Sequence, residues 1–367
     1  MRLEFLAVAL VVVLAYVAWH VWMLPPVAKW AKWLAAAAVV ACVGLTFFSL
    51  TRYLDRIPMW MAKVAYNVGN KSLIIILYML MIFLLADLLR LVHVLPTAWV
   101  RDNWWSCGVL VAVLAVVFVY GSVHYRHKVR VPLDLSAHGK SLVEGQGVRL
   151  VALSDLHLGY HNGRKELARW VDLINAEHPD AVLLAGDLID RSLRPLRDED
   201  MAAELRRIEA PVYACLGNHE YYADYYSPGE VEKFYRDAGI TLLQDSVATM
   251  GNIAILGRDD RSNLHRLSVR QLQERYRIPQ TSYLILLDHQ PYRLEEAEKA
   301  GVDLQLSGHT HRGQVWPISW ITDALYECSW GTLKKGSTDY YVSSGMGIWG
   351  AKYRIGTQSE YVVINLF

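Results

Sequence analysis

Four long apolar stretches in the first third of the chain constrain its fold more than any other feature. Each is close to the ~20 residues that a helix needs to cross the hydrocarbon core of a bilayer. The stretches are Leu3–Leu24, Trp30–Leu50, Leu73–Leu95 and Trp104–Val123. Pro25 and Pro26 separate the first two, because a helix cannot easily continue through that pair. We therefore predict an N-terminal α-helical bundle of four membrane spans, in residues 1–123.

A cleaved signal peptide is the alternative interpretation of the first stretch. We favour an uncleaved span, because no small-residue cleavage site precedes the break at Pro25 and three further spans follow. The composition agrees with this interpretation, since 53% of the 367 residues are hydrophobic.

The distribution of Lys and Arg predicts which side of the membrane the rest of the chain occupies, because cytoplasmic loops retain these residues. Four spans place both ends of the bundle on one side. The basic residues expected on that side are Arg2, Arg52, Arg56, Lys63, Lys71, Arg126, Lys128 and Arg130. Those expected on the other side are Lys29, Lys32 and Arg101. We therefore expect a multi-pass protein of the inner (cytoplasmic) membrane with a cytoplasmic C-terminal domain.

Two charged residues, Asp87 and Arg90, lie inside the third predicted span. They are three residues apart and so occupy neighbouring surface of one helix. Charges inside a span are functional candidates by default. We favour a self-neutralised pair that reaches toward the nearby helix end, and both roles remain open at this point.

The pattern changes at Val148 to short apolar runs that alternate with polar helical segments. The expected strands are Val148–Leu153, Ala181–Ala185, Val212–Leu216, Ile253–Leu256, Tyr283–Leu287, Leu304–Leu306, Tyr340–Val342 and Tyr361–Leu366. The expected helices are Leu167–Ala176, Glu199–Ile208, Gly229–Ala238 and Arg293–Ala300. This alternation predicts an α/β domain with a buried sheet, in residues 148–367. The polar segment 124–147 is interpreted as a linker that could hold one edge strand.

Metal-binding residue types follow five of the expected strands. The five clusters are Ser154-Asp155-Leu156-His157, Gly186-Asp187-Leu188-Ile189-Asp190, Gly217-Asn218-His219-Glu220, Asp288-His289-Gln290 and Gly308-His309-Thr310-His311. Ligand sites of open α/β sheets lie outside the carboxyl ends of the strands, so the clusters should meet at one edge. One such cluster could be only a turn or a helix cap. Five together, with carboxylate, imidazole and amide groups, predict a metal centre for Mn, Fe or Zn.

Local geometry favours the same interpretation. In Asp-x-His and His-x-His the residues i and i+2 point to the same side of extended backbone, so both side chains can reach one centre. Glycines precede Asp187, Asn218 and His309, and they allow the backbone to turn sharply and approach closely.

Charge and cysteine content argue against other classes of protein. A formal net charge of +1 disfavours a domain built around nucleic-acid phosphates. The four cysteines are far apart in the sequence, so neither a disulfide framework nor a zinc knuckle is expected.

The order of the motifs resembles that of the calcineurin-like metallophosphoesterase superfamily, in particular its membrane-associated bacterial branch. The resemblance covers Val148 to Phe367 and includes Gly257-Arg258-Asp259-Asp260 and Gly345-Met346-Gly347. It implies two packed mixed sheets flanked by helices. It also implies a hydrolase of phosphoester or pyrophosphate bonds, in which two divalent metals, Mn foremost and Fe or Zn as alternatives, generate a hydroxide.

The resemblance implies a role for each site residue. One metal would be held by Asp155, His157 and His311, a second by Asn218, His289 and His309, with Asp187 bridging both. His219 resembles the general acid, Asp190 the carboxylate that orients it, and Arg191 a phosphate-binding arginine of some relatives. Asp288 departs from the pattern, which more often has a small residue there; it would support a ligand or alter the metal preference.

An apolar stretch, Trp316-Pro317-Ile318-Ser319-Trp320-Ile321, follows the His311 cluster and could be a lid that faces the membrane. Four tyrosines could line the same cleft, and packing is the alternative for both groups. They are Tyr221, Tyr222, Tyr225 and Tyr226.

An anchored hydrolase with an apolar lip suggests a lipid substrate, such as the nucleotide-linked UDP-diacylglucosamine that some relatives cleave. The alternatives are a tethered phosphatase for soluble nucleotides or phosphoproteins, and a non-enzymatic membrane sensor.

Overall fold

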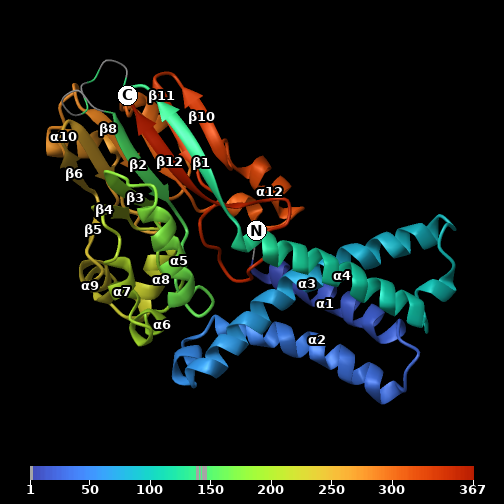
Figure 1. Cartoon of the computed structure of the whole chain (residues 1–367). Coiled ribbons are helices and arrows are strands. Elements are labelled where there is room, and N and C mark those ends of the chain that lie inside the picture. Colours follow the sequence, from blue (N-terminus) through green and yellow to red (C-terminus); the bar gives the residue numbers. More distant parts are fainter. Residues whose placement is uncertain (1–2, 138–139, 141, 143–146) are drawn as a thin grey trace. The chain divides into compact units, whose positions relative to one another are not determined.

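The computed structural model describes residues 3–137, 140, 142 and 147–367, which form two compact units (Figure 1). Of the described residues, the first unit comprises those up to residue 122 with 350–352, and the second comprises those from 123 to 349 with 353–367. Arg2, which the topology prediction counts among the basic residues, lies outside the described residues.

The first unit is built from four long helices. They are α1 (Leu3–Met23), α2 (Lys29–Ser49), α3 (Met59–Leu91) and α4 (Trp104–Arg126). Short 3₁₀ turns, η1 (Arg52–Arg56) and η2 (Thr97–Trp99), lie in the two loops that flank α3. Among the described residues α2, α3 and α4 are long and apolar enough to cross a membrane, whereas α1 contributes the shorter segment Val8–Met23. Three predicted spans are therefore supported, and a fourth remains a prediction.

The helix α3 extends further toward its N-terminus than hydrophobicity predicts. It covers Met59–Leu91, whereas the apolar stretch is Leu73–Leu95. Apolar composition marks the part that can cross a bilayer, while the helix itself begins after Pro58, whose fixed φ suits a helix start. Lys63 and Lys71 therefore lie on the helix and not in a loop.

The intramembrane charges belong to a larger hydrogen-bonded group. The Asp87 carboxylate accepts a hydrogen bond from Nη1 of Arg90 at 2.9 Å, and this is the ion pair expected from the sequence. It also accepts from the Tyr16 hydroxyl at 2.7 Å and lies 3.0 Å from Nε2 of His20. Tyr16 and His20 are on α1, so this group joins α1 to α3. Polar contacts of this kind between helices are favourable in lipid, where water cannot replace them.

The second unit contains two six-stranded sheets. In the first, the strand order is β1 (Lys128–Leu135), β12 (Ser359–Leu366), β2 (Val148–Leu153), β3 (Ala181–Ala185), β4 (Val212–Cys215) and β5 (Ile240–Leu242). In the second, the order is β10 (Gly331–Lys335), β11 (Thr338–Val342), β9 (Leu304–Ser307), β8 (Tyr283–Leu287), β7 (Ile253–Gly257) and β6 (Ser246–Met250). Strands β2 to β5 are parallel, as are β7, β8, β9 and β11, while β12, β10 and β6 pair antiparallel with β2, β11 and β7. Both sheets are therefore mixed, as predicted.

The core lies between the sheets and under the flanking helices. Leu150, Leu183, Ile285 and Leu304 are fully buried where the two sheets face each other. The first sheet is covered on its other side by α5 (Arg164–Asn175), α7 (Met201–Leu205) and α9 (Glu230–Asp237). The second is covered by α10 (Val269–Tyr276) and α11 (Glu295–Lys299). The unit is thus a helix, sheet, sheet, helix sandwich.

The helix predicted for Glu199–Ile208 is shortened to Met201–Leu205 in the structure, where it is the second of two short helices. They are α6 (Arg194–Asp198) and α7, and Asp200 between them has a left-handed backbone with φ 50°. A residue in that conformation cannot continue a right-handed helix.

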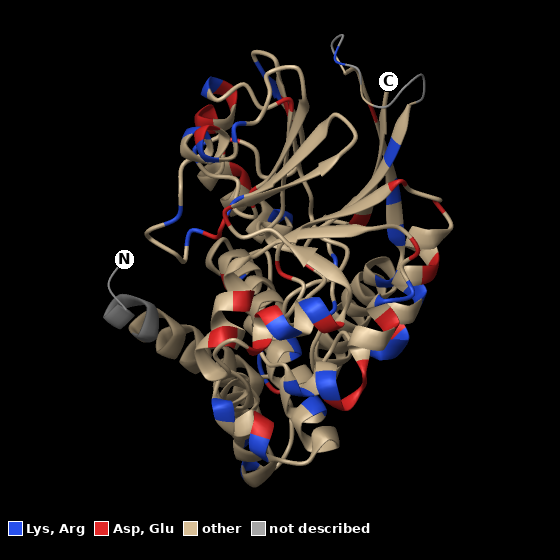
Figure 2. Ribbon diagram, turned by 90° about the vertical axis from the view of Figure 1, so that its left-hand side faces the viewer, with Lys and Arg blue, Asp and Glu red and all other residues tan. Residues whose placement is uncertain are grey.

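Acidic and basic residues are interspersed along the helices in view in Figure 2. Some pair between neighbouring helices of the α/β unit, such as Arg197 with Glu230 at 2.6 Å, both exposed. Exposed ion pairs contribute about 0–1 kcal/mol each, so burial in the sandwich core dominates the stability of this unit.

Candidate metal centre

Every predicted metal ligand directly follows a parallel strand or lies within four residues of its end. Asp155 and His157 follow β2, Asp187 follows β3, Asn218 opens α8 (Asn218–Tyr226) after β4, His289 follows β8, and His309 and His311 follow β9. Parallel strands present their carboxyl ends at one edge of a sheet. These edges of the two sheets lie close together, since ligand atoms from both sheets approach one another.

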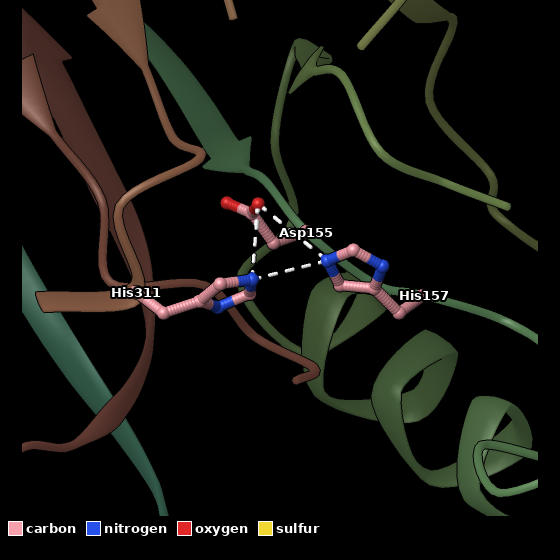
Figure 3. Close-up of side chains that lie close together, drawn as sticks. All are labelled: Asp155, His157 and His311. Carbon is pink, nitrogen blue, oxygen red and sulfur yellow. Dashed lines mark hydrogen bonds and ion pairs between the residues drawn. The ribbon is translucent and has the colours of Figure 1, made fainter. Parts of the chain in front are cut away.

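The first group joins residues from both sheets. Nε2 of His157 lies 3.1 Å from Nε2 of His311, and Oδ1 of Asp155 lies 3.7 and 3.5 Å from these two nitrogens (Figure 3). The ligand atoms lie within 4.8 Å of one another. One cation placed among them would contact a carboxylate and two imidazoles.

Asp187 lies between this group and a second one. Its Oδ2 is 3.6 Å from Nε2 of His157 and 3.1 Å from Nε2 of His289. Asp187, His289 and His309 offer ligand atoms within 4.8 Å of one another. Nδ1 of His289 donates to the Ala185 carbonyl at 2.7 Å, which turns Nε2 toward Asp187. Asp187 therefore lies between two groups of candidate metal ligands.

Asn218 supplies a further acceptor. Its Oδ1 is buried and has no hydrogen-bond partner among the described residues. A buried carbonyl oxygen is costly to leave unpaired, and a cation would satisfy it. The donor set thus fits two divalent metals with mixed N and O ligands.

The protonation states suit metal binding. Burial lowers the pKa of His309 to about 4 and that of His311 to about 3, so both imidazoles are neutral at pH 7 and have a lone pair to offer. Burial acts to raise the pKa of Asp155 and of Asp187, but the neighbouring histidines outweigh it and both pKa values are lowered. Both carboxylates are therefore ionised.

The pKa of His157 shows how strongly this place attracts positive charge. Burial acts to lower the pKa, but the carboxylates of Asp155 and Asp190 outweigh it and raise the pKa to about 10. The pKa of His289 is also raised, because the charge of Asp187 outweighs burial. Carboxylates that stabilise an imidazolium also stabilise a metal cation, which displaces the proton.

The backbone is strained where it presents the ligands. Five of the seven predicted ligands are non-glycine residues with positive φ: Asp155 (54°), His157 (45°), Asp187 (53°), His309 (70°) and His311 (48°). Such conformations cost of order 1–3 kcal/mol each and are concentrated at functional sites. The rest of the fold therefore holds these side chains in place against a local preference.

Glycines allow the closest approaches in the site. A Cβ atom on Gly217 would lie 2.1 Å from Oδ1 of Asp187, and one on Gly308 would lie 2.2 Å from Oδ2 of Asp155. Any side chain at either position would displace a carboxylate. The sequence-based expectation of close backbone approach at these glycines is confirmed.

Glu220 is a central residue of the site that the sequence reasoning does not assign. Its buried carboxylate accepts from the backbone N–H groups of Gly217 (2.7 Å), Asp187 (3.1 Å) and Ile189 (2.8 Å). It therefore holds the β3 and β4 loops together. Burial, with the charge of Asp187, raises its pKa to about 7. The available signal was its position as the third residue of α8, where a carboxylate commonly caps the backbone.

Arg354 is a second unpredicted residue, and it is fully buried. It donates to the carbonyls of His311 (2.8 Å), Ser344, Gly345 (3.3 Å) and Gly347 (3.2 Å). It thereby fixes the segment around Gly345 against the His311 loop. Burial lowers its pKa to about 10, which leaves it charged at pH 7. No local motif marks this residue, because its partners are remote or are backbone groups.

His219 and Asp190 lie beside the ligands, and Arg191 follows Asp190 in the chain. Nδ1 of His219 donates to the backbone carbonyl of Asp190, whose carboxylate Oδ1 is 3.7 Å from that nitrogen and 3.5 Å from Nδ1 of His157. Main chain and carboxylate of Asp190 thus both face His219. Nη2 of Arg191 donates to the Tyr226 hydroxyl at 3.2 Å.

Asp288 is buried and clasped by two arginines. Its Oδ2 accepts a hydrogen bond from Nη1 of Arg258 at 3.2 Å, and its Oδ1 accepts one from Nη1 of Arg266 at 2.9 Å. Asp288 therefore joins the His289 loop to the segment after β7, which agrees with a supporting role beside the ligand.

The family model that this chain matches and three similar proteins are all described as phosphoesterases or as containing a phosphoesterase domain. Residues 148–313 match the family model described as calcineurin-like phosphoesterase. A "transmembrane protein with metallophosphoesterase domain" from Danio rerio is 28% identical over 89% of this chain and 78% of its own length. An uncharacterized metallophosphoesterase of Campylobacter jejuni is 30% identical over 69% of this chain and 68% of its own, and one of Aquifex aeolicus is 30% identical over 62% and 88%. With residues for a binuclear metal site in place, this chain belongs to the calcineurin-like metallophosphoesterase family.

Proposed function

We propose that this protein hydrolyses the phosphoester or pyrophosphate bond of a membrane lipid, with nucleotide-linked lipid precursors as the leading class. The observation that carries the proposal is the exposed apolar face of α12 (Ile318–Leu325), where Trp320 is 64%, Ile321 54% and Leu325 68% exposed. The helix α12 packs on the 3₁₀ turn η3 (His311–Gly313), which contains a predicted metal ligand. Large apolar groups beside a catalytic loop are costly in water and favourable against lipid.

We also propose four spans, membership of the membrane-associated bacterial branch, and a catalytic domain on the cytoplasmic side of the inner membrane. The hydrogen bonds from Tyr16 and His20 to Asp87 support α1 as a span, because they join it to the helix α3 at an intramembrane position. The excess of Lys and Arg on one side supports the orientation. A fluorescent protein fused after Phe367 tests it, because it should fluoresce if that end is cytoplasmic and stay dark if it is exported through the general secretory route.

The proposed ligands are Asp155, His157 and His311 for one metal, and Asn218, His289 and His309 for the other, with Asp187 shared. Two divalent cations bound there supply Lewis-acid chemistry and activate water at neutral pH. We propose Mn as the native metal, since mixed O and N ligands suit it. Metal analysis of the protein as purified, followed by reactivation of stripped protein with Mn, Fe or Zn, tests this assignment, which a preference for Zn or Fe would contradict.

We assign His219 the transfer of a proton to the leaving oxygen. Because Nδ1 must donate to the Asp190 carbonyl, Nε2 is the nitrogen that can gain or release a proton during turnover. The backbone N–H of His219 donates to Oδ1 of Asp187 at 3.0 Å, which ties the imidazole to the ligand cluster. Asp190 positions the imidazole, and Arg191 is the proposed phosphate-binding residue.

His219→Ala should lower kcat by about 10²- to 10⁴-fold for a phosphodiester with a poor leaving group, because protonation then limits the rate. A p-nitrophenyl leaving group needs little protonation and should suffer far less. Metal content should stay near that of the parent protein. Steady-state kinetics with both substrates check the prediction, and equal losses would contradict the acid role.

Replacing Trp320 and Ile321 together with serine should raise KM for a lipid diphosphate in liposomes and spare a small soluble diester. Trp316 stays in place because it is less exposed and contacts the Trp320 ring at 5.3 Å. Leu264→Ser is the matched control, since Leu264 is 90% exposed in a loop remote in sequence from α12.

Unchanged lipid kinetics in a stable double variant would contradict the lipid-facing role of α12. That outcome would favour a membrane-tethered phosphatase for soluble nucleotides or phosphoproteins.

A further inference from the structure

Three arginines in the segment after β7 differ in how their charges are compensated. Arg258 and Arg266 both bind the buried carboxylate of Asp288. Arg261 has no carboxylate partner in the described part of the chain, and its guanidinium lies over the ring of Tyr292 at 4.0 Å. Stacking on an aromatic ring holds a guanidinium in one orientation and leaves its N–H groups available. The exposed Arg261 thus carries an uncompensated charge on a preorganised side chain.

Aromatic contacts connect Arg261 to the metal centre. The ring of Tyr292 contacts that of Tyr326, with centroids 4.8 Å apart, and the two hydroxyls are hydrogen-bonded at 2.9 Å. The Tyr326 ring in turn lies edge-on to the imidazole of His309, at 6.4 Å. Since a hydroxyl pair uses only one of its two hydrogens, one O–H remains able to donate. The Arg261 guanidinium and a tyrosine hydroxyl therefore lie near His309, a proposed metal ligand, to which they are connected by the rings of Tyr292 and Tyr326.

Side-chain hydrogen bonds tie the residue before Arg261 to the loop that holds His289. The preceding residue, Asp260, is fully buried and accepts from Nε2 of Gln290 at 2.9 and 3.1 Å. Gln290 directly follows His289, so the start of the Arg261 segment is fixed relative to a ligand loop. Arg261 is for this reason a positioned group and not an arbitrary surface cation.

We propose that Arg261, Tyr292 and Tyr326 form a second anion subsite, which binds a phosphate group of the substrate other than the one that is hydrolysed. A guanidinium and a hydroxyl donor are the groups that recognise phosphate oxygens. A substrate with one phosphate would leave this subsite without a ligand, whereas a diphosphate would occupy both places. The inference rests on phosphoester hydrolysis at the adjacent centre, and it narrows the substrate to compounds that carry at least two phosphate groups.

Calorimetric binding to the full-length, Mn-loaded protein in detergent tests the subsite without turnover. The probes are methylphosphonate and alkylene diphosphonates with one, two or three methylene groups, which differ in the reach of the second anion. At least one diphosphonate should bind the parent protein more tightly than methylphosphonate. Arg261→Gln should reduce that preference about tenfold, as expected for loss of a charged hydrogen bond. Tyr326→Phe should reduce it less.

Arg270→Gln is the matched control, because Arg270 is exposed on α10 and pairs with Glu274 of its own helix. Arg270→Gln should still bind the diphosphonate more tightly than methylphosphonate. Chelation of the bound metals by diphosphonates occurs in every variant, so a loss seen only in Arg261→Gln reports on the subsite. The subsite is refuted if the parent protein shows no preference for any diphosphonate, or if Arg261→Gln retains it. Hydrolysis of a bis-aryl phosphate, measured in parallel, separates this failure from failure of the hydrolase itself.

Discussion

Asp187→Ala should remove most of the bound metal and lower hydrolysis by more than about 100-fold, a larger loss than residues that merely support ligands produce. Oδ2 of Asp187 faces imidazoles of both ligand groups, and Oδ1 accepts from the backbone of His219. Its removal therefore takes the shared carboxylate from both cation sites at once. It also leaves Asp155 as the remaining carboxylate among the predicted ligands, so less negative charge balances the two cations.

Elemental analysis for metal per chain, with hydrolysis of a bis-aryl phosphate, checks this expectation. Asp198→Ala is the control, because Asp198 is at the surface and pairs with Arg194, four residues earlier in the chain. Retention of two metals and near-normal turnover in Asp187→Ala would show that the shared-ligand assignment is wrong.

Gly217→Ala should lower turnover by on the order of 10²-fold through geometry alone, since a misplacement of about 1 Å at a catalytic group can cost that much. The new Cβ would lie 2.1 Å from Oδ1 of Asp187 and 2.7 Å from its backbone nitrogen, so one of the two loops must move. The backbone of Gly217 has φ −109°, which alanine adopts freely. The effect is therefore steric and not conformational.

Gly108→Ala is the matched control, because a Cβ at that helical position would meet no atom of another described segment within 4 Å. It should leave activity unchanged. Circular dichroism on heating should show that Gly217→Ala stays folded at the assay temperature. Normal activity in a folded Gly217→Ala protein would contradict the close packing of the β3 and β4 loops at the site.

The strands that carry the ligands could be predicted from the sequence because their signals are local. The structure gives β2, β3 and β8 the predicted bounds, since each is a buried apolar run that ends in the polar residues of the site. The carboxylate and imidazole residues at these strand ends predicted that the clusters meet at one site, whereas the arrangement in two sheets was implied by the family resemblance. The edge strands β5, β6 and β10 were not predicted, because they are short or only partly buried.

Residues that act through remote partners could not be predicted in this way. Arg354 binds the His311 carbonyl 43 positions away, and Tyr16 binds Asp87 71 positions away. Each contact forms only when the chain is folded, and neither residue type is unusual for its segment. The role of Glu220 in joining two loops likewise depends on the approach of Asp187. The proposed role of Arg261 depends on its contact with the ring of Tyr292, which the sequence does not predict.

The most direct test of a two-metal phosphoesterase is Mn-dependent hydrolysis of bis-p-nitrophenyl phosphate by the purified full-length protein in detergent. Protein treated with a chelator and then freed of it should be inactive, and activity should return as Mn is added, reaching its maximum near two metals per chain. Full activity in the chelated protein, or no turnover at a measured content of two metals, would contradict a binuclear hydrolytic centre.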